Sequence, residues 1–141
     1  MAIANRKLQI DGDRNRLSDS MNPDILSDRL LDLAACVGNV VDALPDTRLG
    51  RHIASQLVRS GTSPLPNYEE ARGAESRADF VHKLNIALKE LRESRAWLRL
   101  IIRAELLPAA RLEELLDEAT QLCNIVAKSV VTAKNNKSRN R

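Results

Sequence analysis

The chain has 141 residues, a length that suits one domain with room for a sizeable hydrophobic core. Hydrophobic residues make up 43% of it and charged residues 29%, whereas aromatic residues make up only 2% and leave almost nothing for base-stacking or carbohydrate-binding surfaces. The net charge is +3, and no segment approaches the roughly 20 apolar residues that a membrane span needs.

Residues 1–21 mix Asp, Arg, Asn, Gly and Ser without a regular period, and we predict that they form a flexible leader. Charged side chains lie where a signal peptide needs an uninterrupted apolar stretch, so the chain is expected in the cytoplasm.

The two cysteines of the chain, Cys36 and Cys123, lie in apolar helical patterns. They could form a disulfide, but two reduced, buried thiols are the expected state.

The first predicted helix opens at Asn22, whose side chain can cap it, and it tolerates Pro23 in its first turn. An apolar residue recurs every three or four positions until Pro45 stops the helix. This apolar stripe consists of Leu26, Leu30, Leu33, Val37, Val40 and Leu44.

The second predicted helix begins after residue 46 and carries one apolar residue per turn. These residues are Leu49, Ile53 and Leu57. Pro64 and Pro66 then remove two amide donors and clash with the preceding turn, so the helix is predicted to kink or break there. Helical propensity resumes at Asn67 and continues to about Arg72.

The third predicted helix opens at Ser76, which can cap it, and Pro108 precedes the fourth. The apolar stripe of the third helix is Phe80, Leu84, Ala87, Leu91, Ser94, Leu98 and Ile101, and that of the fourth is Leu112, Leu115, Ala119, Leu122, Val126 and Val130. Four amphipathic helices with short connections and no strand candidate predict an all-α, antiparallel up-and-down four-helix bundle over residues 22–133. A basic, disordered tail is predicted over residues 134–141.

Catalytic chemistry finds little support in the sequence. A di-iron bundle needs inward carboxylates from all four helices and a Glu-x-x-His motif on two of them. The chain has only His52 and His82, and only His82 follows an acidic residue, Asp79, at that spacing. Hydroxyl residues cluster at 60–63 without a nucleophile elbow, and such groups usually bond to free backbone groups beside a helix break. We therefore predict no catalytic residue, no metal and no cofactor, and the protein is not expected to be an enzyme.

Charges on the third predicted helix fall on two edges, because each residue turns about 100° around the axis. The basic residues on one edge are Lys89, Arg92, Arg99 and Arg103; the acidic residues on the other are Asp79, Glu90 and Glu93. The tail adds Lys134, Lys137, Arg139 and Arg141. Either the two edges pair with neighbouring helices or subunits, or the eight basic residues form a phosphate-binding surface.

A family resemblance rests on Ser60-Gly61-Thr62-Ser63, followed by Asn67-Tyr68-Glu69-Glu70-Ala71 and by the long third helix through Trp97-Leu98. Residues 24–133 resemble the four-helix-bundle proteins named for intervening sequences in bacterial large-subunit ribosomal RNA genes. The resemblance implies a cytosolic homopentamer. It also implies kinship with accessory proteins of diversity-generating retroelements, which bind nucleic acid and partner a reverse transcriptase. Where relatives usually carry Gly-Ala, this chain has Leu65-Pro66.

Two hypotheses follow. In the first, the protein is a homo-oligomeric, non-enzymatic accessory protein that binds RNA or DNA electrostatically, with little sequence preference. In the second, it is a structural or protein-interaction scaffold whose charged edges serve assembly. Trp97 is expected in the core or in a subunit interface, and Tyr68, which lies in the family motif, in a subunit contact.

Overall fold

The computed structural model describes residues 22–139, with the side chains of residues 22–136. The predicted leader, residues 1–21, and residues 140–141 lie outside this part of the chain. Its elements are α1 (Pro23–Ala43), α2 (Arg48–Thr62), α3 (Pro64–Arg72), α4 (Arg77–Arg103), the short 3₁₀ helix η2 (Ala109–Arg111) and α5 (Glu113–Arg139).

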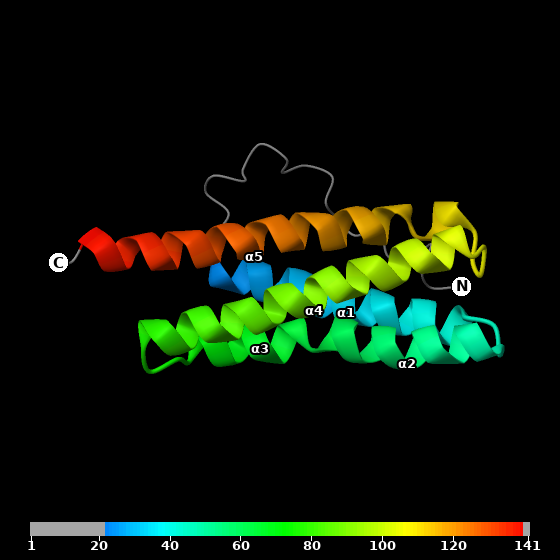
Figure 1. Cartoon of the computed structure of the whole chain (residues 1–141), viewed down its shortest axis with the longest axis horizontal. Helices are drawn as coiled ribbons and strands as arrows, with labels where there is room; N and C mark the ends of the chain where they lie inside the picture. The colour runs from blue at the N-terminus through cyan, green and yellow to red at the C-terminus, as the bar shows by residue number, and fades with distance from the viewer. Residues whose placement is uncertain (1–21, 140–141) are drawn as a thin grey trace.

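The described residues form helices and no strand (Figure 1). Helix α1 packs against α2, α3 and α5, and α4 packs against the same three helices. In Figure 1, α2 and α3 follow one another in line, on the opposite side of α4 from α5. Together they form the second of four antiparallel rods. The predicted all-α, up-and-down four-helix bundle is therefore confirmed.

The predicted break in the second rod is a kink. Ser63, between α2 and α3, keeps right-handed helical dihedrals, with φ −67° and ψ −34°. Its N–H donates to the carbonyl oxygen of Arg59 at 3.1 Å, and its own carbonyl accepts from the N–H of Asn67 at 3.2 Å. The Asn67 amide also donates to the hydroxyl of Ser63 at 2.9 Å. These bonds maintain helical geometry at Ser63 despite the amide donors that Pro64 and Pro66 lack, so α3 continues within the bundle.

Side-chain caps fix where the helices begin. Oδ1 of Asn22 accepts from the N–H of Asp24 at 2.9 Å. Oγ1 of Thr47 accepts from an N–H three residues on, at 3.0 Å, and Oγ of Ser76 does the same at 3.1 Å. Each cap satisfies one of the four backbone donors that a helix leaves open at its start. The predicted caps at Asn22 and Ser76 are thus confirmed.

The predicted apolar stripes form the core. Its most deeply buried members, each no more than 1% exposed, include Leu30, Leu33, Val37, Ile53, Leu57, Leu84, Leu91, Leu98, Leu112, Leu122 and Val126. Leu49 departs from the prediction and is 40% exposed. Gly50 is buried instead, and a Cβ there would lie 2.1 Å from the carbonyl oxygen of Pro45. Only glycine fits this close approach between α1 and α2.

The final helix is longer than predicted. The sequence placed the end of the bundle at residue 133 and a disordered tail after it, whereas α5 continues to Arg139. No glycine or proline follows Pro108, so nothing in this segment stops helical propagation. The start of the basic tail is therefore helical and extends α5 past the start of α1 (Figure 1).

Candidate nucleic-acid-binding surface

One line of exposed side chains follows the outer side of α4. Its members, spaced by four and three residues, are Asn85, Lys89, Arg92, Ala96, Arg99 and Arg103, and all six are exposed. We call the four cations among them the basic edge: Lys89, Arg92, Arg99 and Arg103. At about 1.5 Å per residue, the rise from the first to the last is about 21 Å. The structure thus brings together four of the eight predicted basic residues.

The basic edge lies within electrostatic reach of α5. Burial raises the pKa of the Cys123 thiol, while the positive charges of Arg95 and Arg92 act in the opposite direction. Cys123 and Cys36 are buried and form no disulfide, as predicted. The thiol of Cys123 is therefore neutral at neutral pH and offers Arg92 no negative charge.

The other four predicted residues belong to the end of the chain. Lys134 is exposed on α5, and Lys137 and Arg139 lie in the last turns of the same helix, beyond the described side chains. Arg141 lies outside the described residues. The structure therefore describes Lys134 as a separate cation on a neighbouring helix.

Two of the three acidic residues on the other edge of α4, Glu90 and Glu93, pair with a single cation of α2. Nη1 of Arg59, on α2, lies 2.8 Å from Oε2 of Glu90, and the same guanidinium donates to Glu93 through Nη2. Burial acts to raise the pKa of Glu93, but hydrogen bonds from Arg59 and Trp97 outweigh it and hold the pKa below its usual value. Pairing between helices, one of the two predicted interpretations, thus holds for Glu90 and Glu93.

The basic edge is different. Within residues 22–136, none of Lys89, Arg92, Arg99 and Arg103 forms an ion pair or a hydrogen bond through its side chain. Four like charges along one helix edge repel each other weakly in water. An anion bound beside them would relieve this repulsion. The two edges of α4 therefore differ in kind: one is paired with α2, and the other faces solvent.

Trp97 belongs to the paired edge. Its Nε1 donates to Oε1 of Glu93 at 3.3 Å, and its ring meets that of His52 edge-on, with centroids 5.7 Å apart and planes at 80°. Trp97 is partly buried and packs against the core. These contacts place the indole between α4 and α2, with its donor satisfied inside the chain.

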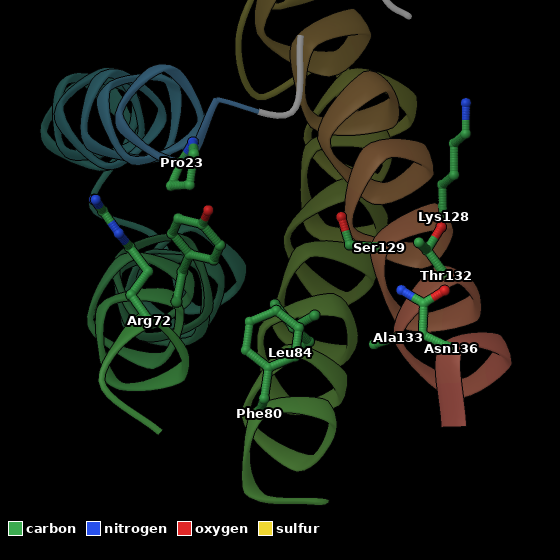
Figure 2. Close-up of a pocket in the computed structure, with 10 residues that line it drawn as sticks. Pro23, Arg72, Phe80, Leu84, Lys128, Ser129, Thr132, Ala133 and Asn136 are labelled. Atoms are coloured by element: carbon green, nitrogen blue, oxygen red, sulfur yellow. The ribbon is translucent and has the colours of Figure 1, made fainter. Parts of the chain in front are cut away.

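Tyr68 is one of the residues that line a groove of about 470 Å³ near the start of α4. The groove is lined by Pro23, Tyr68, Arg72, Phe80, Leu84, Lys128, Ser129, Thr132, Ala133 and Asn136. In Figure 2, Phe80 and Leu84 lie between Arg72 on one side and the residues of α5 on the other. Tyr68 itself is only 6% exposed, and burial raises the pKa of its phenol. Most of its ring is thus packed inside the chain.

The hydroxyl cluster beside the kink serves the backbone and the core. Oγ1 of Thr62 donates to the carbonyl oxygen of Val58 at 2.6 Å. Ser60 is fully buried, and its hydroxyl accepts from that of Ser94, on α4, at 2.9 Å.

Over the described residues, no three His, Cys, Asp or Glu side chains lie close enough to hold a metal ion. In that same part of the chain, no helix is both long and apolar enough to cross a membrane.

Two interactions escaped sequence reasoning. Arg59 pairs with Glu90 and Glu93, which lie 31 and 34 positions further along the chain, so no local pattern predicts these pairs. Arg29, on α1, pairs with Glu118, on α5. These two residues are 89 positions apart, so no local pattern predicts this pair either. The available signal for Glu118 was its place on the apolar face of α5, one residue before Ala119, where an unpaired carboxylate would be costly.

Comparison with known proteins agrees with this fold. The family model described as 23S rRNA-intervening sequence protein matches residues 27–128. A crystal structure of a protein of unknown function from the S23 ribosomal protein family of Bacteroides thetaiotaomicron is 34% identical, with a TM-score of 0.72. The match covers 78% of this chain and 98% of that one. No curated protein matches the chain. From the family model and this structural neighbour together, we conclude that the chain belongs to the 23S rRNA-intervening sequence protein family.

Proposed function

We propose that this protein is a non-enzymatic, self-associating accessory protein that binds nucleic acid through the basic edge of α4. The observation that carries the proposal is the contrast between the two edges. Arg59 pairs with Glu90 and Glu93, whereas no basic-edge side chain forms an ion pair or a hydrogen bond within residues 22–136, and only the charge of Lys89 acts on Glu93 from a distance. Paired acids and unpaired cations on one helix leave a one-sided positive field, which attracts phosphates.

Binding of this kind is electrostatic. Each Lys or Arg that neutralises a phosphate releases condensed counterions, so affinity falls as salt rises. Contacts to phosphates position a nucleic acid but do not read its bases. Self-association would repeat the basic edge several times on one particle and raise the avidity. Weak sequence preference and strong salt dependence are the expected signature.

Fluorescence anisotropy with a structured RNA between about 50 and 200 mM salt tests the proposal. The double variant Arg92→Gln/Arg99→Gln should weaken binding at low salt and reduce the magnitude of the salt slope by about 2. The matched control is Arg48→Gln/Arg77→Gln, which removes the same charge from two exposed arginines outside the basic edge. Absence of affinity at the lowest salt, or equal losses in both double variants, would contradict the proposal and favour a scaffold.

Self-association is the second part of the proposal and rests on the family resemblance. It is supported by apolar side chains that remain exposed in the single chain: Ile25, Leu31, Val58 and Val131, between 40% and 56% exposed. A homopentamer should give a light-scattering mass of about five times 15.7 kDa. A monomer mass across the concentration range would contradict it. A protein partner such as a reverse transcriptase is the further component that the resemblance implies.

A further inference from the structure

The aromatic side chains of this protein lie away from the basic edge. The sequence holds one Trp, one Tyr and one Phe. Tyr68 is buried on α3, and Trp97 lies on the opposite edge of α4, against α2. Phe80 lines the groove and packs against the core (Figure 2). None of the three rings can therefore stack on a base of a strand that follows the basic edge.

One further ring lies near the line of exposed residues. His82 is exposed on α4, seven positions before Lys89, and therefore about 10 Å further along the helix axis. A single imidazole at the end of the edge can stack on one base at most. The basic edge itself offers cations and, between them, the small side chain of Ala96.

Single-stranded nucleic acids depend on stacking for affinity. Proteins that hold them combine a cationic groove with aromatic rings, each worth about 1–3 kcal/mol per stacked base. A flexible strand on the basic edge would have to become ordered without that compensation. The chemistry of the basic edge therefore disfavours single strands.

A double helix does not have to become ordered when it binds. Its phosphates are already ordered, and duplex DNA carries one negative charge per about 1.7 Å of axis. The basic edge presents four cations over about 21 Å on one long α-helix, whose backbone fixes their spacing. Three of the four are arginines, whose planar forks suit phosphate oxygens. We propose that the basic edge binds the phosphate backbone of a nucleic-acid double helix in preference to a single strand. This inference rests on the proposed function.

The test uses the full chain and four labelled probes of about 24 nucleotides or base pairs, measured by anisotropy at about 100 mM salt. They are an RNA duplex, a DNA duplex and an unstructured single strand of each type. Both duplexes should bind at least about tenfold more tightly than the single strands. The variant Arg92→Gln/Arg99→Gln should weaken duplex binding, whereas Arg48→Gln/Arg77→Gln should not.

Two outcomes separate the inference from the function on which it rests. Single strands that bind as tightly as the duplexes, with dependence on Arg92 and Arg99, would overturn the duplex preference and leave nucleic-acid binding intact. No binding to any probe would overturn both. His82→Ala and the intrinsic fluorescence of Trp97 provide independent readouts. Loss of binding in His82→Ala, or quenching of Trp97 by the single strands, would reveal base stacking and contradict the inference.

Discussion

Arg29 of α1 donates to Oε1 of Glu118, on α5, through both Nε and Nη2, with Nε at 3.1 Å. The carboxylate side chain is 2% exposed and the guanidinium side chain 21%. Nη2 of Arg29 also donates to Oε1 of Gln121 at 3.1 Å. The pair therefore joins the first and last helices of the bundle at a place where the carboxylate is withdrawn from water and the cation is not.

Removing only the cation should be costly. Arg29→Met leaves a buried carboxylate without its partner, and we expect the free energy of unfolding to fall by about 2–3 kcal/mol, below the usual value for fully buried pairs because Arg29 reaches solvent. The double variant Arg29→Met/Glu118→Leu should recover most of that loss. Urea unfolding followed by circular dichroism measures both. A double variant no more stable than Arg29→Met would show that the lost ion pair, and not the desolvated charge, accounts for the loss.

The kinked rod should be sensitive to one added methyl group. A Cβ on Gly61 would lie 2.7 Å from Cγ1 and 2.8 Å from Cγ2 of Val37. The branched side chain of Val37 is fully buried and cannot rotate away, so Gly61→Ala should destabilise the bundle by about 1–3 kcal/mol. In a Val37→Ala background the same change should cost little. Equal effects in both backgrounds would place the strain elsewhere.

The sequence was informative wherever a local pattern controls the outcome. Apolar periodicity predicted the bundle and its core, Pro64 and Pro66 predicted the kink, and helix geometry placed the basic residues of α4 on one edge. It could not show that Arg59 pairs with the acidic edge, because the partners are distant in sequence. The basic edge was thus predictable as a pattern, but its lack of partners emerged only from the fold.

The pairing of Glu93 should appear in the pH dependence of stability. Hydrogen bonds from Arg59 and Trp97 lower its pKa against the opposing effect of burial. A carboxyl whose pKa is lower when folded stabilises the protein above its unfolded pKa of 4.5, and this contribution is lost as the pH falls through the folded value. Stability should therefore fall more steeply below about pH 4.5 in the wild type than in Glu93→Gln.

Urea midpoints at about pH 7 and about pH 3.5, compared between the two proteins, measure this difference. It should be less than about 1 kcal/mol, since Glu93 is partly exposed and water screens the pair. The fluorescence of Trp97 gives a second readout, because its Nε1 donates to the same carboxylate. Parallel pH profiles would mean that the Arg59 pair contributes nothing measurable.

The turn that follows α4 contains a residue in an unfavourable backbone conformation. Glu105 has φ 55°, in the left-handed region, where a side chain costs about 1–2 kcal/mol relative to glycine. Its N–H donates to the carbonyl of Ile102, and the N–H of Leu106 donates to that of Ile101, both at 3.1 Å. This is the Schellman arrangement, in which glycine commonly occupies the position of Glu105.

Replacing Glu105 by glycine should therefore stabilise the protein. The relief of the left-handed penalty exceeds the extra chain entropy that glycine gains on unfolding, so Glu105→Gly is expected to add about 0.5–1 kcal/mol to the free energy of unfolding. Glu105→Ala is the matched control, since it removes the same charge and keeps the Cβ that causes the strain. If the two variants gain stability equally, the benefit comes from the lost charge beside the negative end of the helix dipole. A gain confined to glycine assigns it to the backbone.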